Sequence, residues 1–529
     1  MILKSVPTLL LLISLSATAP AQDFINVQVN SDTSGNLHNE EQVAANPLNP
    51  DNVVAVWRDF RLGHRRVGVG YSFDGGLTWR DTLMEENHFP RHSDPGITVD
   101  RNGSFYACIL SYTGNTNQPN GLYVQKSGDG GVSWGPSIAV VESVPGVFED
   151  KQLVACDRND SSPHVGNLYC VWARFYSTQI MFNRSTDGNL SWETPVAVSD
   201  GNASRQWPVP AVGPNGEVYC AWCHLSSPMS IRFDRSTDGG LTWGSDRTVQ
   251  NVSFGSGYIQ PSSTVFSFPA MDVDITEGAR RGHIYIAYMD DAVSGGGTNI
   301  WFTRSTDGGT TWSTRTKIND DPDAGKDHFH PWLCCDLNGD ITVTWYDRRL
   351  DPGNMLMDIY LTQSFDGGTT WTPNVRVTTE SSDPRLFPSA DGPEPPNEAK
   401  PLAGRLGEYN GLWAVSTDRI YAVWADTRNG SPDIFAATQL DTTGISGPEP
   451  VSLNTLQWGP NPFVARTTVR RDGGAASFDV FDRSGQLIRA GCIGTWDGRD
   501  RSGRSVRPGV YLAVVRTGEV AKLVRLAGR

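Results

Sequence analysis

The sequence predicts an all-β protein: a seven-bladed β-propeller followed by a small β-sandwich. The main observation is an eight-residue pattern, Ser-x-Asp-Gly-x-x-x-Trp, that recurs at intervals of roughly fifty to seventy residues, as expected for one supersecondary unit per repeat. The 55 Gly and 33 Pro among 529 residues are typical of a chain with many turns. The six copies begin at Ser72, Ser127, Ser185, Ser236, Ser305 and Ser364.

Each copy has the chemistry of a tight turn between two strands. Its Asp carboxylate can accept hydrogen bonds from turn amides, and the following Gly adopts a positive φ at no steric cost. The closing Trp lies on the returning strand and offers a large apolar face for burial. We therefore interpret the copies as structural turns rather than catalytic groups. Their carboxylates belong to Asp74, Asp129, Asp187, Asp238, Asp307 and Asp366.

A strand rich in β-branched and aromatic residues precedes each copy, and a seventh such strand, residues 419–424, has no copy after it. The last unit continues through residues 433–438 and then lacks a fourth strand. Residues 24–30 near the N-terminus can supply it, and this pairing would remove the open edge of the propeller. The sequence therefore predicts seven blades. The six earlier strands span residues 52–57, 104–109, 167–172, 217–222, 283–288 and 340–345.

The N-terminal residues 1–21 predict a secretory signal peptide, with Lys4, an apolar run at residues 9–13 and a small-residue exit at 19–21. The run is too short to cross a bilayer, and no later stretch reaches about 18 apolar residues. The formal net charge of −14 argues against nucleic acid or an anionic membrane as the main partner. We expect a secreted or cell-surface protein with no membrane span.

The chain after the propeller, which we assign to residues 22–443, changes character. A turn-rich linker at 444–451 leads to residues 452–529, where short strands alternate with Gly and Pro. This region resembles the Ig-like domain of flagellar hook-capping proteins and the C-terminal sorting domain of bacterial type IX secretion substrates. The resemblance implies a sorting or anchoring domain that the secretion machinery recognises; a plain small β-sandwich is the alternative. It is carried by residues 458–463, 496–500 and 508–512.

The repeated turn resembles the Asp-box, or BNR, repeat of sialidase-type β-propellers. Residues 55–61 and 409–412 also resemble sialidase segments, the first a strand ending in Glu-Gly-Arg and the second a Tyr-Ser-x-Leu segment. The resemblance implies Tyr409 as a nucleophile activated by Glu408, with Asp59 as the acid/base residue. Sialidases have six blades, so six is the alternative to seven.

The sequence departs from the sialidase pattern at two arginines. Residues 40–43, Glu-Glu-Gln-Val, stand where an Arg-Ile-Pro segment should open the first blade. Residues 354–360 lack the arginine expected before the last Asp-box. Two of the three arginines that grip the substrate carboxylate in sialidases therefore have no counterpart here.

Ligand sites of propellers lie where the innermost strands and the loops after the second strands meet at the axis. When the repeats are aligned with one another, polar residues such as Glu40 and Asp150 fall near the starts of the inner strands. Arginines fall at the ends of the second strands. Such arginines suit anionic or hydroxyl-rich ligands. The candidate substrate-binding residues are Arg58, Arg61, Arg174, Arg348, Arg428, Asp94, Lys151 and His328.

Several of these arginines belong to a repeated Asp-x-Arg pattern that follows the strand Trp, as at Asp59 and Arg61. A carboxylate beside a guanidinium can form a bidentate structural pair, and recurrence in several blades favours that interpretation.

We also interpret the eight cysteines as structural, because they occupy small strand positions and no second Cys pair or paired His completes a zinc site. The sequence indicates no cofactor and no metal.

Three hypotheses for the function remain open. The first is a secreted, exo-α-sialidase-like glycoside hydrolase acting on terminal acidic sugars. The second is a non-catalytic propeller that binds a carbohydrate or glycoprotein at the cell surface. The third is a lyase or another polysaccharide-active enzyme that uses His328 or His330 as its base. The absent arginines favour the second hypothesis, and the dense axial charge favours the first.

Overall fold

The computed structural model describes residues 24–439 except 115–118, 143, 254–255, 260–262, 292–296 and 388–405, together with most of the strands between residues 456 and 525. The predicted signal peptide at 1–21 and the linker at 444–451 lie outside the described residues. The chain divides into two compact units, residues 1–441 and 442–529. Among the described residues, no helix has the length and apolar character to span a membrane.

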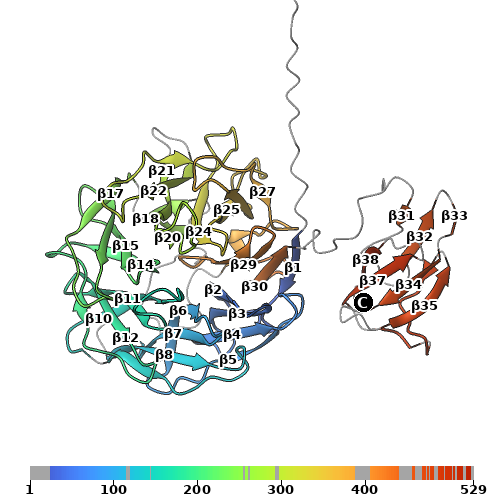
Figure 1. Cartoon of the computed structure of the whole chain (residues 1–529), viewed down its shortest axis with the longest axis horizontal. Coiled ribbons are helices and arrows are strands. Elements are labelled where there is room, and N and C mark those ends of the chain that lie inside the picture. Colours follow the sequence, from blue (N-terminus) through green and yellow to red (C-terminus); the bar gives the residue numbers. More distant parts are fainter. Residues whose placement is uncertain are drawn as a thin grey trace, which may run out of the picture. The chain divides into compact units, whose positions relative to one another are not determined.

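The first unit is a seven-bladed β-propeller, which confirms the predicted fold and excludes the six-bladed alternative (Figure 1). Its innermost strands surround the axis, and each is followed by its hairpin partner in the same blade. The β-branched and aromatic content of the inner strands suits burial on both faces. The innermost strands are β2 (His38–Asn46), β6 (Arg91–Val99), β10 (Phe148–Cys156), β14 (Arg205–Val212), β20 (Ala270–Val273), β24 (His328–Cys335) and β28 (Gly411–Ser416).

The second strands hold the largest buried side chains of the propeller. Five of them carry a Trp that is at most 1% exposed, Trp57, Trp172, Trp222, Trp345 and Trp424. These indoles fill the space between blades. The second strands are β3 (Asn49–Asp59), β7 (Phe105–Tyr112), β11 (Leu168–Phe175), β15 (Val218–His224), β21 (Ile284–Asp291), β25 (Ile341–Asp347) and β29 (Arg419–Asp426).

The third strands of the first six blades each end at the Ser that opens an Asp-box, so the box forms the turn into the outermost strand. In blade 4, Asp238 Oδ1 accepts hydrogen bonds from Ser236 Oγ at 2.6 Å and from Thr242 N at 2.9 Å. The third strands are β4 (Arg66–Ser72), β8 (Asn120–Ser127), β12 (Gln179–Ser185), β16 (Ser230–Ser236), β22 (Thr298–Ser305), β26 (Asp358–Ser364) and β30 (Asp433–Gln439).

The outermost strand of the last blade comes from the N-terminal end of the chain, as predicted. Strand β1 pairs with β30 from Phe24 opposite Gln439 to Gln28 opposite Phe435. The side chain of Asn30 donates to Asp433 at 3.0 Å and reinforces this closure. The outermost strands are β5 (Arg80–Leu83), β9 (Ile138–Glu142), β13 (Val196–Ala197), β17 (Arg247–Asn251), β23 (Thr316–Lys317), β27 (Val375–Arg376) and β1 (Phe24–Gln28).

Two smaller elements decorate the propeller. A hairpin of β18 (Ser256–Ile259) and β19 (Ser263–Phe266) lies between blades 4 and 5 in sequence, and a short 3-10 helix, η1 (Pro384–Leu386), follows blade 6. The seven cysteines of the propeller are buried free thiols, and the sulfurs of Cys108 and Cys170 lie 3.8 Å apart.

The second unit contains antiparallel strands in two groups. One has the order β31-β32-β33 with β36 also pairing β32, and the other has the order β35-β34-β37-β38. The strands are β31 (Leu456–Trp458), β32 (Thr467–Arg471), β33 (Gly474–Ala475), β34 (Ser477–Phe481), β35 (Leu487–Ile493), β36 (Thr495–Trp496), β37 (Gly509–Val515) and β38 (Val520–Arg525).

We predict that Asp238→Ala lowers the free energy of unfolding by about 1–3 kcal/mol, because the turn amide and hydroxyl groups lose their acceptor. Chemical denaturation monitored by Trp fluorescence measures this change. The exposed Glu380→Ala is the control and should change stability by less than about 0.5 kcal/mol. Equal stability of the Asp238 variant and the native chain would contradict a structural role for the box.

Candidate functional site

The inner strands share a distortion that brings selected side chains to the axis. Strands β2, β6, β10, β14 and β24 each contain a β-bulge in the middle of the pairing with the second strand. Bulges re-aim side chains and are frequent beside active sites. The first extra residue of each bulge has a positive φ, which is uncommon for a side chain other than Gly. These residues are Glu40 (57°), Asp94 (50°), Lys151 (56°), Trp207 (58°) and His330 (48°).

The five bulge residues and their neighbours surround the axis of the propeller as a ring, and charged residues gather on one side of it. We call Glu40, Arg58, Asp94, Lys151 and Glu408 the axial cluster. The ammonium group of Lys151 contacts Asp94 and lies 3.2 Å from Glu408 Oε1 and 3.7 Å from Glu40 Oε1. Arg58 Nη1 lies 3.4 Å from Glu40 Oε1. Three carboxylates therefore meet two cations from four different blades.

The other side of the ring is aromatic. Trp207, Phe268, Trp332 and Tyr409 pack with ring centroids 5.6–6.4 Å apart. Trp207 joins the two sides, because its Nε1 donates a hydrogen bond to Glu408 Oε2 at 2.6 Å. The ring of bulge residues thus places an indole directly beside the axial cluster.

Burial gives the carboxyl groups of the axial cluster different proton affinities. Loss of hydration raises the pKa of Glu40 to about 7, although Arg58 and Lys151 oppose the rise. Burial would also raise the pKa of Asp94, but the charges of Lys151 and Arg58 more than offset it and the pKa is lowered. Near neutral pH one carboxyl can therefore hold a proton while its neighbour stays ionised.

Tyr409 lies against the cluster but its hydroxyl is occupied. The side chain is 2% exposed, and the phenol donates a hydrogen bond to the carbonyl of Pro95 at 3.1 Å. Burial raises the pKa of this phenol well above its usual value. These contacts are those of a residue that holds two blades together.

The structure brings four of the sequence candidates together, Glu408, Arg58, Asp94 and Lys151, and Tyr409 packs beside them. The others lie in ion pairs within their own blades. Arg61 binds Asp59 at 2.7 Å, Arg174 binds Glu149 at 2.5 Å and Arg428 binds Asp426 at 2.7 Å. Arg348 lies 3.5 Å from Asp327, and His328 lies 2.9 Å from Asp321.

The Asp-x-Arg pattern forms a repeated structural unit with the strand Trp. The indole Nε1 of Trp57 donates to Asp59 at 2.8 Å, and the guanidinium of Arg61 donates to the same carboxylate. The same two contacts recur at Trp345, Asp347 and Arg349 and at Trp424, Asp426 and Arg428.

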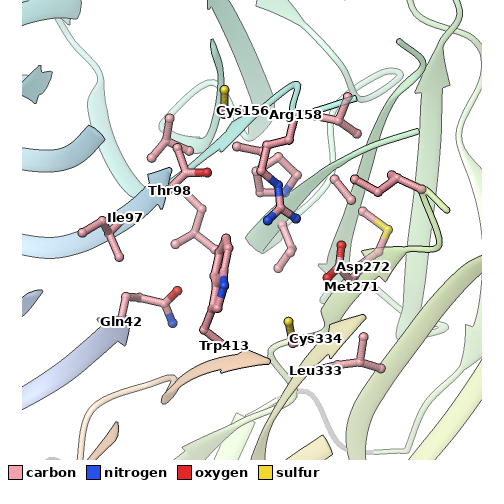
Figure 2. A pocket seen from close by; sticks show the side chains of 18 of the residues that line it. Gln42, Ile97, Thr98, Cys156, Arg158, Met271, Asp272, Leu333, Cys334 and Trp413 are labelled. Carbon is pink, nitrogen blue, oxygen red and sulfur yellow. The ribbon is translucent and has the colours of Figure 1, made fainter. Parts of the chain in front are cut away.

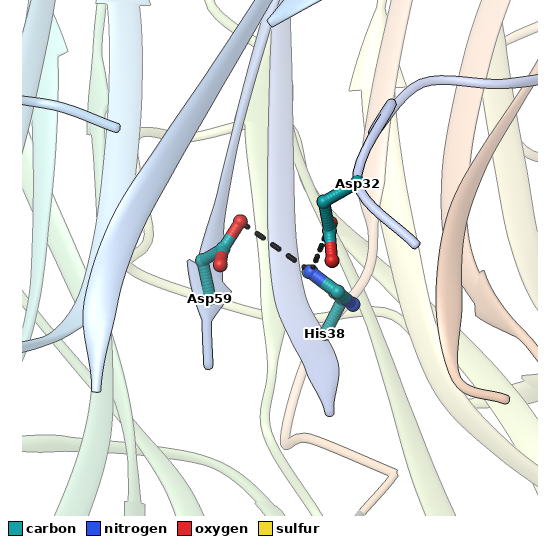
Figure 3. A group of neighbouring side chains, drawn as sticks. All are labelled: Asp32, His38 and Asp59. Atoms are coloured by element: carbon teal, nitrogen blue, oxygen red, sulfur yellow. Dashed lines mark ion pairs between the residues drawn. The ribbon is translucent and has the colours of Figure 1, made fainter. Parts of the chain in front are cut away.

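Asp32, His38 and Asp59 form a compact group that could offer three ligand atoms to a metal ion (Figure 3). His38 Nε2 lies 2.9 Å from Asp32 and 3.5 Å from Asp59, and Arg61 also approaches both carboxylates. The two carboxylates raise the pKa of His38 to about 10 against the effect of burial. The contacts of His38 and Arg61 with both carboxylates form an ion-paired latch. His328, Asp321 and Asp347 repeat it in blade 6.

The sequence analysis did not identify the aromatic residues beside the axial cluster, because Trp207, Phe268 and Trp332 resemble ordinary residues of a hydrophobic core. A signal was nevertheless present. In three of the five bulges the residue with a positive φ is followed by Pro, which suits an unpaired backbone position in a sheet. The pairs are Asp94-Pro95, Trp207-Pro208 and His330-Pro331.

No family model matches the chain. A sialidase of Micromonospora viridifaciens is 32% identical over 154 residues, which cover 26% of this chain and 23% of that protein. Over these 154 residues the chain is similar to part of a sialidase. The chain spans about a quarter of the length of this relative.

Solved structures with a similar fold include a protein of unknown function from Dyadobacter fermentans, with a TM-score of 0.42, 15% identity and coverage of 62% of this chain and 95% of that one. A leech intramolecular trans-sialidase has a TM-score of 0.44 and 13% identity, with coverage of 62% of this chain and 67% of that one.

We predict that the histidine latch makes stability depend on pH. A pKa that is raised in the folded state stabilises fully below the unfolded value of about 6.5, and this stabilisation is lost as pH rises through the folded value. The pKa of His38 is raised to about 10 and that of His328 is also raised. The free energy of unfolding should therefore fall between pH 6.5 and pH 10.

The variant His38→Asn should be less stable than the native chain at pH 6 by on the order of 1–4 kcal/mol. This difference should shrink toward pH 10, as measured by urea denaturation at each pH. His64→Asn is the matched control and should show no such convergence. A stability difference that stays constant from pH 6 to 10 would rule out a charged His38.

Proposed function

We propose that this sialidase-like propeller is a secreted, glycan-directed protein that binds its sugar at the axial cluster. The observation that carries the proposal is the meeting of Glu40, Asp94, Glu408 and Lys151 beside the indole of Trp207. All but Glu408 of these residues occupy strained bulge positions, and such strain concentrates at functional sites.

The chemistry of the ring suits a sugar. Carboxylates accept hydrogen bonds from hydroxyl groups, and the Lys151 ammonium donates to ring or hydroxyl oxygens. Aromatic side chains offer an apolar face, and small-molecule sites typically combine such faces with a few well-placed polar groups. Glu408, with a side chain 16% exposed, and Lys151, at 9%, are the members of the cluster through which a ligand would make contact.

The arrangement supports glycoside hydrolysis by two carboxyl groups. Glu40, whose pKa is raised to about 7, can hold the proton that a leaving glycosidic oxygen requires. Glu408 accepts from both Lys151 and Trp207, so its oxygens act as acceptors and can serve as base or nucleophile. The reaction breaks the glycosidic bond, with water supplying the hydroxyl group of the new sugar end.

An exo-α-sialidase-like reaction would need Tyr409 to leave Pro95 and several arginines to grip a carboxylate. Among the described residues, the axial cluster contains a single arginine, Arg58. These contacts favour a hydroxyl-rich, uncharged sugar over a terminal acidic one.

The second candidate is non-catalytic binding of a carbohydrate or glycoprotein at the cell surface. It is favoured by the engaged phenol of Tyr409 and by the pairing of Arg61, Arg174 and Arg428 within their blades. Both candidates place the ligand at the same residues, so one set of variants tests both.

We predict that Glu408→Gln and Glu40→Gln lower kcat on a panel of fluorogenic glycosides by about 10²–10⁴-fold, since each removes one proton-transfer group. Both substitutions keep the shape of the side chain, and thermal melting should confirm folding. Glu193→Gln, a half-exposed partner of Arg184, is the control and should keep native activity.

A native chain that hydrolyses none of the glycosides but binds sugars on a glycan array, with binding lost in Glu408→Gln, would support the non-catalytic candidate. A native chain that neither hydrolyses nor binds sugars, or variants that keep full activity, would contradict the axial site.

We also propose that residues 1–21 direct export and that the C-terminal region acts as a sorting or anchoring domain recognised by the secretion machinery. The separation of the chain into units 1–441 and 442–529 supports independent roles. The final position of the protein would then be the cell surface or the medium.

We predict that residues 22–450 alone fold with an unchanged melting transition, because the strand that closes the last blade comes from residues 24–28. Differential scanning calorimetry of this fragment and of the full chain tests the point. In the cell a chain of residues 1–450, which keeps the proposed export signal, should accumulate in the periplasm. Loss of the propeller transition on truncation would mean that the C-terminal unit is needed for the fold.

A further inference from the structure

A cavity of about 120 Å³ lies at the opposite ends of the inner strands from the axial cluster (Figure 2). In β10 (Phe148–Cys156), Lys151 is near the start of the strand, whereas residues 153–156 and the following residues 157–159 line the cavity. The axial cluster and the cavity are therefore separate sites that share the same strands.

The cavity contains a guanidinium group without an acceptor. Arg158 points into the cavity and lies over the indole of Trp413, 4.7 Å from its centroid (Figure 2). Within the described part of the chain, no carboxylate or carbonyl accepts a hydrogen bond from Arg158. By contrast Arg61, Arg174 and Arg349 each bind a carboxylate. Stacking covers the face of a guanidinium and leaves its N–H edge for a planar acceptor such as a carboxylate.

A fixed carboxylate lines another wall of the cavity. Asp272 accepts backbone hydrogen bonds from Cys335 at 2.9 Å and from Val273 at 2.8 Å, so its orientation is set by β20 and β24. Burial raises the pKa of Asp272, and the charge of Arg158 opposes the rise. Among the described residues, Arg158 and Asp272 do not form an ion pair with each other. Each oxygen keeps a lone pair for a further donor.

The remaining walls limit the size of a ligand. Leu153, Met271 and Leu333 give an apolar lining. Polar residues also line the cavity: Gln42, Thr98, Asp157 and Asn159. An apolar cavity of about 150 Å³ can hold a benzene ring, so a volume of about 120 Å³ suits a molecule of roughly six non-hydrogen atoms.

We propose that this cavity binds a small carboxylate that carries a hydroxyl or ammonium donor on the neighbouring carbon. The carboxylate takes the N–H edge of Arg158, and the donor reaches Asp272. A ligand of this kind joins the positive and the negative group that the protein leaves apart, and its short carbon chain packs against the apolar lining.

Isothermal titration calorimetry of the full chain with L-lactate, L-alanine, acetate and inorganic phosphate tests the proposal. Lactate or alanine should bind saturably, and whichever binds more tightly identifies the donor as hydroxyl or ammonium. Acetate should bind at least tenfold more weakly because it lacks the contact with Asp272. Asp272→Asn should abolish that difference.

Arg158→Gln should weaken binding of the preferred ligand at least thirtyfold. Since this substitution also removes the stacking on Trp413, Ala155→Leu serves as a second variant that fills the cavity and leaves Arg158 in place. Both should melt near the native temperature. Arg247→Gln removes an exposed guanidinium and is the control with unchanged binding.

Three results would overturn the proposal. The first is the absence of saturable binding of both lactate and alanine, which would mean that the cavity holds only water. The second is binding that survives both Arg158→Gln and Ala155→Leu. The third is phosphate binding more tightly than either carboxylate, with the same dependence on Arg158.

Discussion

The packing of each Asp-box against the preceding blade is the interaction on which the ring depends. The second Gly of the box in blade 4, Gly240, has a φ of 90°, and a Cβ on it would overlap the ring of Phe182 in blade 3. The box Trp243 meets the same ring edge-on, with centroids 5.0 Å apart. Phe233 in blade 4 and Phe302 in blade 5 repeat this role toward the boxes that follow them. The turn is thus both a hairpin and the contact that sets the angle between blades.

A ring held in this way can tolerate unfavourable backbone at its centre. Five residues with side chains adopt a positive φ in the inner strands, at a cost of about 1–3 kcal/mol for each such conformation. The Trp-Asp-Arg units and the histidine latches lie at the ends of the second strands, where they fix the loops around these bulges. The rigid outer parts of the blades therefore stabilise the strained residues that define the axial cluster.

The fold could be predicted from sequence because its signals are local and repeated. Short stretches of sequence were enough to recognise the spacing of the Asp-boxes, the seven aromatic strands and the N-terminal strand that completes the last blade. The site was predicted less completely. Glu408, Lys151, Asp94 and Arg58 were recognised, because charged residues near the starts of inner strands and the ends of second strands have few structural reasons to be there.

The remaining candidates show what a linear pattern leaves out. Asp59 and Arg61 are two residues apart, so their side chains share a face and can neutralise each other before any ligand is considered. Trp207 looks like core until the bulge in β14 is known to turn it toward Glu408. The face on which a side chain emerges depends on a one-residue insertion that hydrophobic alternation does not reveal.

The pairing of β1 with β30 also constrains how the molecule is made. Asn30 and Asp433, which bond across this closure, are 403 residues apart, so the ring closes only after nearly the whole propeller has been synthesised. Contacts of such long range fold slowly, since a large loop must be ordered before they form. Until then β1 presents an open strand edge that could pair with another chain. A nascent propeller of this kind is therefore exposed to aggregation during synthesis until β1 can pair with β30.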